Sequence, residues 1–462
     1  MRRVLFLVDR NNLGKQAEGE FGTFRLTENG EAFNTIFTVN RLRSSSIPSD
    51  SNVVISTIQR LFSFLKGETI EDNDDDENEP IEEVTLPPNP NLPHDYFDMI
   101  IIDECHRSIY GNWRKVLEYF DTARLVGLTA TPIPETMAFF NNNCIVNYTL
   151  EKSIVDGVNV DCRVYRIKTQ VTETGGAILE GEKFKEETRY TGEVKIVSSK
   201  ETKIYTNKEL NRSIINPAQI KLVLSTYRDV VYTELFNDPQ REPNMDFLPK
   251  TLIFALNEAH ATNIVQITKE VFGRTDDRFV QKITYSAGDS NELIRQFRND
   301  KDFRIAVTCT LVATGTDVKP LEVVMFMRDV ESLPLYIQMK GRGVRTIGDE
   351  QLRNVTPNAF SKDCFYLVDA VGVTEHAQTV APIDDAPTTK TITLKELLER
   401  ISHGYIPDEY LKRLAATLAR IYNKADDPQR KEFVRLSHDD MKELSARIYD
   451  ALEKGILPPF VI

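Results

Sequence analysis

Cysteine pairs and long apolar runs are both missing from this sequence. Its five cysteines stand far apart and form no Cys-x-x-Cys pair, so neither a disulfide framework nor a zinc site is predicted. No stretch is long and apolar enough to span a bilayer. Only five apolar residues separate Arg3 from Asp9, which is too short a run for a signal peptide. These absences favour a cytoplasmic protein with reduced thiols.

An excess of basic charge is also missing, since the net charge is −13. That value argues against a nucleic-acid partner, because phosphate contacts need Lys and Arg. However, nine of the excess negative charges fall between Glu71 and Glu83, so the rest of the chain carries only −4. We expect the segment from about Glu68 to Pro93 to be disordered and dispensable, because its composition cannot form a core. A local basic groove elsewhere stays possible.

Two series of short apolar runs predict two parallel sheets. Runs that are apolar at every position are typical of strands buried on both faces, and helical patterns such as residues 113–120 lie between them. The first series is 4–8, 53–55, 99–102 and 124–128, and the second is 251–255, 283–285, 304–308, 323–326 and 364–368. Alternating strands and helices predict an α/β fold with functional loops at the carboxyl ends of the strands.

Two further segments differ from these series. Residues 151–210 are rich in Thr, Glu, Lys and Gly, and they predict a connector with short antiparallel strands, including 163–167. Residues 386–462 are helical in period. One predicted helix face consists of Leu394, Leu397, Leu398 and Ile401, and another of Leu411, Leu414, Leu418 and Ile421.

The strongest chemical signal is a pair of carboxylates, Asp103 and Glu104, at the end of the run 99–102. Mg²⁺ bound with a nucleotide is usually held by one carboxylate together with phosphates and waters. Asp103 is therefore a candidate Mg²⁺ ligand, and Glu104 a candidate base that activates water. For an isolated Asp-Glu pair, the commoner explanation is a strand that ends in a polar turn.

Two other blocks strengthen the chemical interpretation. Thr129 and Thr131 follow the next strand, where their hydroxyls could hydrogen-bond the carboxylates. Arg342 and Arg345 are three residues apart, so on a helix they would share a face and could stabilise charge on a γ-phosphate. Taken alone, the first block could be an ordinary turn and the second a solvated basic helix.

These blocks, in this order, resemble the superfamily 2 helicases and translocases, and more closely the restriction subunit of type I restriction-modification enzymes. The resemblance covers roughly residues 1–375. Its motifs Ia, II, III, IV, V and VI correspond to residues 3–13, 103–113, 128–132, 251–261, 305–317 and 338–345. One departure is Thr310, where the family often has an acidic residue. The resemblance implies two RecA-like lobes at 1–150, truncated at its amino terminus, and 211–385, with a connector at 151–210 and a helical region at 386–462.

The resemblance also implies roles for single residues. Asp103, Glu104, Gln338, Arg342 and Arg345 would serve catalysis, with Asp103 holding Mg²⁺. Residues that couple the nucleotide to the DNA would be His106, Thr129, Thr131, Gly315 and Asp317. DNA contacts would come from Arg10, Thr57, Gln59, Arg60 and Thr308. Two simpler readings stay open, namely that Thr57 caps a helix beside a surface Arg60, and that His106 is a structural group.

One family motif does not occur within these residues. The phosphate-binding (Walker A) loop, G-x-x-x-x-G-K-[ST], would precede motif Ia, and the only Gly-Lys pair, Gly14-Lys15, continues with Gln16. That loop cradles the nucleotide phosphates with backbone amides and a lysine. We therefore expect a fragment that lacks this loop and the family's nuclease domain, and that hydrolyses no ATP by itself.

The resemblance implies an ATP-dependent motor that translocates double-stranded DNA and is required for cleavage at remote sites. Its cofactors would be ATP and Mg²⁺, and its partners double-stranded DNA and the methyltransferase and specificity subunits, with no membrane. Two alternatives stay open. One is a superfamily 2 DNA helicase or a standalone restriction-like motor, and the other is a non-catalytic remnant that binds DNA or serves assembly.

Overall fold

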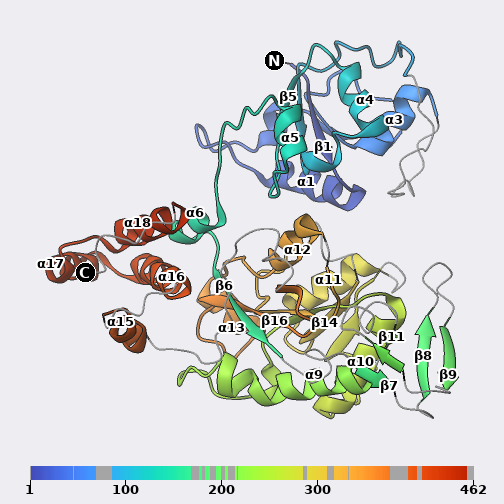
Figure 1. Cartoon of the computed structure of the whole chain (residues 1–462). Coiled ribbons are helices and arrows are strands. Elements are labelled where there is room, and N and C mark those ends of the chain that lie inside the picture. The colour runs from blue at the N-terminus through green and yellow to red at the C-terminus, as the bar shows by residue number, and fades with distance from the viewer. Residues whose placement is uncertain are drawn as a thin grey trace. The chain divides into compact units, whose positions relative to one another are not determined.

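The computed structural model describes residues 2–44, 46–68, 86–167, 176–178, 183–187, 194–198, 203–205, 214–215, 217–284, 289–309, 317–330, 332–374, 394–402 and 408–454. The chain forms two compact units, Met1–Asn147 and Tyr148–Ile462 (Figure 1). Each unit is built around one parallel sheet, and helices follow at the carboxyl end of the chain. The predicted α/β fold class is therefore confirmed.

The first unit contains a five-stranded sheet in the order β2-β3-β1-β4-β5. Every neighbouring pair is parallel. The strands are β1 (Val4–Val8), β2 (Val39–Arg41), β3 (Val53–Thr57), β4 (Met99–Ile102) and β5 (Arg124–Gly127). Four of them coincide with the predicted apolar runs to within two residues. β2 was not predicted, because a three-residue strand with Asn40 and Arg41 has no apolar run.

Helices cover both faces of this sheet (Figure 1). Because side chains alternate along a strand, Leu5 and Leu7 face one core, and Phe6 and Val8 face the other. The helices are α1 (Asn11–Thr23), α2 (Phe33–Ile36), α3 (Ile58–Lys66), α4 (Gly111–Tyr119), α5 (Pro134–Phe139) and the 3₁₀ turn η1 (Cys105–Arg107). α1 packs with Phe6 and Val8, whereas α3 and α4 pack with Leu5 and Leu7.

The segment before β4 corrects one expectation. Leu92 is fully buried in the core of the first unit. The Asn89 amide donates a hydrogen bond to Phe64 O at 2.9 Å, and Asn89 N donates to the Tyr119 hydroxyl at 3.0 Å. Residues 86–93 are thus packed, because one leucine and one asparagine give this Pro-rich stretch an anchor. The acidic residues 69–85 lie outside the described residues.

The second unit contains a six-stranded parallel sheet in the order β13-β14-β12-β15-β16-β6. The strands are β6 (Asp161–Arg166), β12 (Thr251–Phe254), β13 (Val280–Lys282), β14 (Ile305–Thr308), β15 (Val323–Phe326) and β16 (Cys364–Asp369). Two predictions fail here. The strand expected at 283–285 lies three residues earlier, at Val280–Lys282. β6 is a parallel edge strand of the sheet, whereas an antiparallel strand was expected there.

Apolar side chains fill both faces of this second sheet. One core contains Ile253, Val307 and Met325 under α9 and α10, and the other contains Leu252, Phe254 and Val324 under α11 and α12. The helices are α9 (Pro217–Val230), η2 (Val231–Leu235), η3 (Met245–Phe247), α10 (Glu258–Phe272), α11 (Ser290–Asn299), α12 (Leu333–Lys340) and α13 (Asp349–Val355). Short antiparallel pairs come from β7 (Gly176–Ile178), β8 (Lys183–Glu187), β9 (Val194–Ser198), β10 (Lys203–Tyr205) and β11 (Ile214–Ile215).

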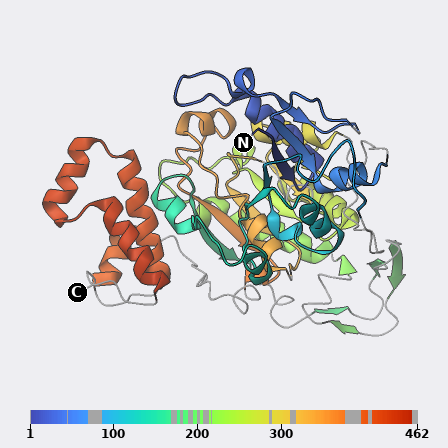
Figure 2. The same ribbon diagram turned by 90° about the horizontal axis from the view of Figure 1, so that it is seen from above.

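The carboxyl-terminal helices form a core of their own, and in Figure 2 they gather in one cluster. They are α15 (Leu394–Ser402), α16 (Asp408–Lys424), α17 (Asp427–Ser437) and α18 (Met441–Glu453), joined by α6 (Leu150–Val155). Leu397, Leu411 and Leu414 are buried in this core as predicted, but Leu398 is 47% exposed. Across the described residues, no helix combines the length and apolarity that a membrane crossing requires.

We predict that Leu92→Ala lowers the free energy of unfolding of the first unit by about 2–5 kcal/mol, because it opens a cavity in the core. Trp113 is the single tryptophan and packs against Phe62, so its fluorescence reports this unit during urea denaturation. Ile36→Ala is the matched control, since Ile36 is 44% exposed. Equal effects of the two substitutions would show that Leu92 contributes no core packing.

Candidate active site

The carboxyl ends of three neighbouring strands meet at one edge of the first sheet. β1 leads into Asp9, β4 into Asp103 and β5 into Leu128. Backbone hydrogen bonds fix this alignment, since Asp103 N donates to Leu7 O at 2.9 Å and Leu128 N donates to Ile102 O at 2.8 Å. The parallel register therefore brings residues that are distant in sequence to the same edge.

Asp103 is half-buried at this edge, close to a second carboxylate. Burial raises the pKa of the Asp103 carboxyl above its usual value, and the nearby charge of Asp9 acts in the same direction. One Asp103 oxygen accepts a hydrogen bond from Glu104 N at 3.0 Å. Asp9 is itself paired, since its carboxylate lies 2.5 Å from Arg107 Nη1 and 3.5 Å from Arg10 Nε. A cation near Asp103 would lower the cost of its charge.

Four of the predicted residues lie close together around His106. His106 Nδ1 lies 3.0 Å from Thr129 Oγ1, 3.5 Å from Thr131 Oγ1 and 3.5 Å from Glu104 Oε2. Thr131 N donates a hydrogen bond to Thr129 Oγ1 at 3.0 Å. Burial lowers the pKa of His106, and the neighbouring Arg107 lowers it further. The histidine therefore links the end of β4 to the segment that follows β5, as a neutral ring at pH 7.

The backbone at Glu104 has an unusual conformation. Its φ of 47° and ψ of 46° lie in the left-handed region, which non-glycine residues rarely adopt. This turn begins η1 directly after the strand and points Glu104 and His106 to the same side, 3.5 Å apart. Such strain is typical of functional sites, where the surrounding structure holds it in place.

The residues at this edge fit a magnesium ion bound together with a nucleotide. Mg²⁺ in such sites takes one or two carboxylates, and its other ligands are phosphates and waters. Asp103 supplies a half-buried carboxylate whose raised pKa a cation would lower. Within the described ranges no group of three or more His, Cys, Asp or Glu could hold a metal by itself.

The predicted DNA contacts of the first unit differ in how buried they are. Arg60 is only 2% exposed and its guanidinium donates to Leu42 O at 3.3 Å, so it is not available to a DNA backbone in this structure. The idea of a surface arginine beside Thr57 is corrected as well, because α3 lies against the core. Thr57 caps α3, its hydroxyl accepting from Arg60 N. Gln59 is half-buried on α3, and Arg10 precedes α1.

In the second unit, Arg342 and Arg345 do not lie on a helix, which corrects the sequence-based expectation. α12 ends at Lys340, and the following turn contains Gly341 and Gly343. A Cβ at Gly343 would come within 2.1 Å of the Phe365 ring, so the backbone packs directly on β16 there. Arg345 then pairs with Asn159 in an isolated antiparallel bridge. Gly343 permits this close approach because it has no Cβ.

Other predicted residues of the second unit lie near this turn or at a strand end. Arg345 Nε is 3.8 Å from Asp317 Oδ1, and Arg342 Nε donates to Gln338 O at 3.3 Å. Thr308 is fully buried at the end of β14, and its hydroxyl has no hydrogen-bond partner among the residues that the structure describes. Gly315 lies outside the described residues.

Sequence reasoning missed a buried lysine in this unit. Lys362 Nζ donates hydrogen bonds to Arg345 O at 2.7 Å and to Lys319 O at 2.9 Å. Burial lowers the pKa of Lys362 to about 7. Lys362 therefore joins the end of motif VI to the segment that follows motif V. It stands in no motif, between Ser361 and Asp363, so nothing in the sequence distinguishes it from a surface lysine.

Comparison with known proteins gives related sequences over most of the chain. The family model described as "Type III restriction enzyme, res subunit" matches residues 1–134. The EcoKI endonuclease subunit of Escherichia coli K12, a type I restriction enzyme, is 27% identical over 427 residues, which are 85% of this chain and 32% of that protein. The EcoAI endonuclease subunit of Escherichia coli is 30% identical over 264 residues, covering 54% of this chain and 30% of that protein.

The chain is similar in sequence to the endonuclease subunits of type I restriction enzymes. It spans about a third of the length of these relatives. A solved fragment of an HsdR subunit from Vibrio vulnificus YJ016 has the same fold, with a TM-score of 0.50 and 20% identity. That match covers 84% of this chain and 57% of the solved one. The two parallel-sheet units are accordingly RecA-like lobes.

We predict that Arg107→Gln raises the pKa of His106, because it removes a positive charge that opposes the imidazolium form. The pKa can be followed by NMR titration of the histidine side chains, with His106→Gln assigning the signal. Arg114→Gln on α4 is the matched control, since Arg114 pairs with Glu118. An unchanged His106 titration in Arg107→Gln would show that this arginine does not set the charge of the histidine.

Proposed function

We propose that this chain forms part of the ATP-dependent motor of a type I restriction enzyme, a motor that translocates double-stranded DNA and is required for cleavage at remote sites. The observation that carries the proposal is the group of Glu104, His106, Thr129 and Thr131 beside Asp103, at the carboxyl edge of a parallel sheet. The sequence similarity of the chain to the endonuclease subunits supports the same assignment.

ATP and Mg²⁺ are the proposed cofactors, and the carboxylates have different proposed roles. Asp103 is the first residue after β4 and would hold Mg²⁺ together with the nucleotide. The metal ion would neutralise charge on the phosphates. Glu104 would orient and deprotonate the attacking water. His106 stays neutral because burial lowers its pKa, so it can exchange hydrogen bonds with the two threonine hydroxyls. That network would couple Glu104 to the segment after β5.

Motifs V and VI supply the proposed residues of the second unit. Gln338, Arg342 and Arg345 would sense the γ-phosphate and stabilise charge on it. Asp317 lies 3.8 Å from Arg345 and, with Gly315, would couple the nucleotide to the DNA. Lys362 holds the Arg345 carbonyl, so we add it as a positioning residue. Arg10, Thr57, Gln59, Arg60 and Thr308 remain the proposed DNA contacts. The side chains of Thr57, Arg60 and Thr308 are buried in this structure, so they would have to become accessible before they could contact DNA.

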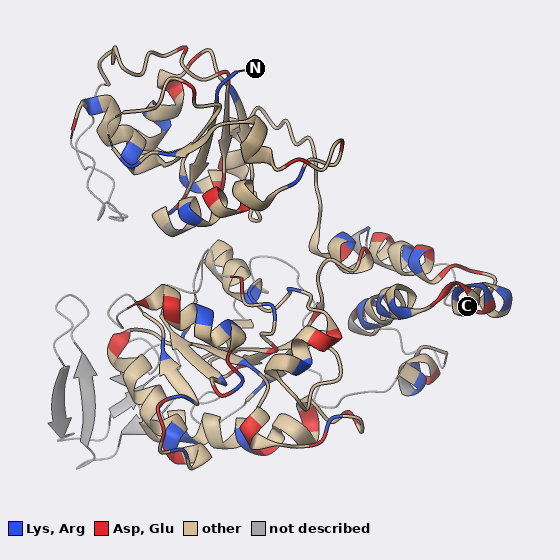
Figure 3. Cartoon of the chain, turned by 180° about the vertical axis from the view of Figure 1, so that it is seen from behind, with Lys and Arg blue, Asp and Glu red and all other residues tan. Residues whose placement is uncertain are grey.

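Double-stranded DNA and the methyltransferase and specificity subunits are the proposed partners, in the cytoplasm. Figure 3 shows Lys and Arg interspersed with Asp and Glu along the carboxyl-terminal helices. A surface of mixed charge suits contacts with another protein better than a nonspecific grip on DNA, which needs an excess of positive charge. We therefore propose that α15–α18 serve subunit docking.

We predict that Glu104→Gln lowers ATP turnover by about 10²–10⁴-fold while ATP and DNA still bind, because the substitution keeps the shape and removes the base. Asp103→Asn should also weaken Mg²⁺-dependent nucleotide binding. Both are measured in the complete subunit with its partners, by phosphate release, nucleotide affinity and triplex displacement. Glu118→Gln, on the exposed side of α4, is the control. Turnover near that of the wild type in either variant would return the motif to a structural turn.

A strand-displacement assay on the same complex separates the translocase from a helicase. A translocase displaces a triplex strand without unwinding the duplex, whereas a helicase separates the two strands. Unwinding that disappears in Glu104→Gln would favour the helicase.

We predict that Arg342→Ala and Arg345→Ala each lower ATP turnover, by up to about 10³-fold, and leave DNA affinity unchanged. A guanidinium that stabilises developing phosphoryl charge acts on the transition state, so DNA binding is spared. Arg295→Ala is the control, since Arg295 lies exposed on α11 and pairs with Glu292. Loss of DNA binding with intact turnover would mean that these arginines contact DNA instead.

A further inference from the structure

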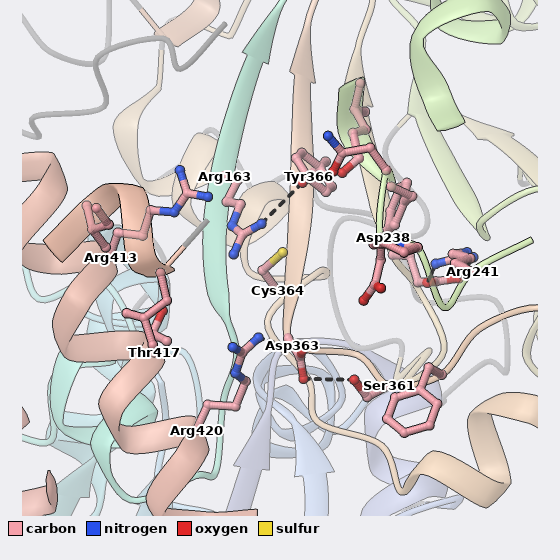
Figure 4. Close-up of a pocket in the computed structure, with 18 residues that line it drawn as sticks. Arg163, Asp238, Arg241, Ser361, Asp363, Cys364, Tyr366, Arg413, Thr417 and Arg420 are labelled. Carbon is pink, nitrogen blue, oxygen red and sulfur yellow. Dashed lines mark hydrogen bonds and ion pairs between the residues drawn. The ribbon is translucent and has the colours of Figure 1, made fainter. Parts of the chain in front are cut away.

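A cavity of about 390 Å³ lies within the second unit, away from the motif residues. Its walls come from β6, from β16, from the loop that follows η2 and from α16. Figure 4 shows Arg163 reaching into it from β6 and Arg413 and Arg420 from α16, with Asp238 and Arg241 on the other side. Such a volume suits one small molecule, since ligand pockets typically measure about 300–1,000 Å³.

One wall of the cavity is basic. Arg420 is already paired, since its Nη1 lies 2.5 Å from Asp363 Oδ2, and Lys424 adds a second cation 3.3 Å from the same carboxylate. Arg163 donates to the Tyr366 hydroxyl at 3.3 Å, and no carboxylate of the described residues lies within ion-pair distance of it. Asp161 acts on this guanidinium without forming an ion pair with it, so an anion bound there could form the charge-assisted hydrogen bonds that Arg163 lacks.

The opposite wall is acidic. Asp238 accepts a hydrogen bond from Gln240 N at 2.9 Å, and no cation among the described side chains pairs with it. Arg241 cannot serve that purpose, because it is buried and bound to Glu322 through two hydrogen bonds of 2.6 and 3.3 Å. The cavity therefore presents a cation and an anion on separate walls, and the fold pairs neither with the other.

Aromatic and aliphatic groups line the cavity between these walls. Phe236 and Phe360 both contribute, and Phe360 is 53% exposed. Leu394 and Leu397 of α15 complete the apolar part. A flat apolar group could pack on these rings.

We propose that this cavity binds a small organic phosphate of mononucleotide size. Its phosphate lies against Arg163, because a guanidinium donates two parallel hydrogen bonds to phosphate oxygens. Its hydroxyl or amino groups donate to Asp238, and its flat ring packs beside Phe236. This site is separate from the Asp103 edge and goes beyond the motor function. Because α16 forms one wall, the ligand holds the helical region to the second sheet.

Adenosine 5′-monophosphate, inorganic phosphate and adenosine are the probes that test this site, titrated into the chain by calorimetry at low salt. We expect the monophosphate to bind more tightly than either of its parts. Arg163→Gln should lower the affinity for the monophosphate by about tenfold or more, because a hydrogen bond to a charged group is lost. Arg163→Lys keeps the charge and should give an intermediate loss. Thermal unfolding of each ligand-free variant checks that it folds.

Three further variants make the test specific. Asp238→Asn should lower the affinity for the monophosphate and leave the affinity for inorganic phosphate unchanged. Arg435→Gln is the matched control, since Arg435 lies on α17 and pairs with Glu432 outside the cavity. Asp103→Asn should leave the affinity for the monophosphate unchanged, which distinguishes this cavity from the proposed hydrolysis site. The proposal is overturned by equal affinity in Arg163→Gln and wild type, by inorganic phosphate binding as tightly as the monophosphate, or by no binding at millimolar concentration.

Discussion

The parallel pairing of β4 between β1 and β5 is the constraint on which the candidate site depends. Asp103 N bonds to Leu7 O, Leu128 N to Ile102 O, and Cys105 N to Leu128 O, so the ladder continues past the ends of the strands. A slip of one residue would turn every side chain to the other face of the sheet. Asp103 would then leave the edge, and His106 would lose Thr129. The strand register thus determines where Asp103 and His106 lie.

Close packing beneath that edge limits what the strands can carry. A Cβ at Gly127 would lie 2.6 Å from the Phe140 ring and 2.8 Å from Cys105 Sγ. Glycine at the end of β5 is therefore what lets η1 settle against the strand, and η1 contains His106. The left-handed turn at Glu104 belongs to the same arrangement, because it starts η1 without an intervening loop. Gly127 and the left-handed turn at Glu104 together place the side chains of Glu104 and His106.

The sequence was informative wherever a strand is apolar at every position. β12, β14 and β15 are buried throughout, and their runs predicted them to within a residue. For β6 it predicted a strand at 163–167 but not the parallel pairing with β16, because an edge strand tolerates Arg163 and Arg166 and so lacks the continuous apolar run of a buried parallel strand. It also failed where burial runs against composition. Arg60 is buried because its guanidinium reaches Leu42 O, and no local pattern encodes a partner 18 residues away.

Motif VI shows how the remaining part of the site depends on contacts that span the second unit. The turn after α12 has no helix to stiffen it, and other segments hold it instead. Val160 N donates to Val344 O at 2.7 Å, Thr346 Oγ1 to Val158 O at 3.1 Å, and Lys362 to Arg345 O at 2.7 Å. Two of these bonds come from the residues that lead into β6, and β6 carries Arg163 into the proposed anion cavity. A ligand bound to Arg163 would therefore contact the strand whose preceding residues, Val158 and Val160, hold the turn that leads to Arg345.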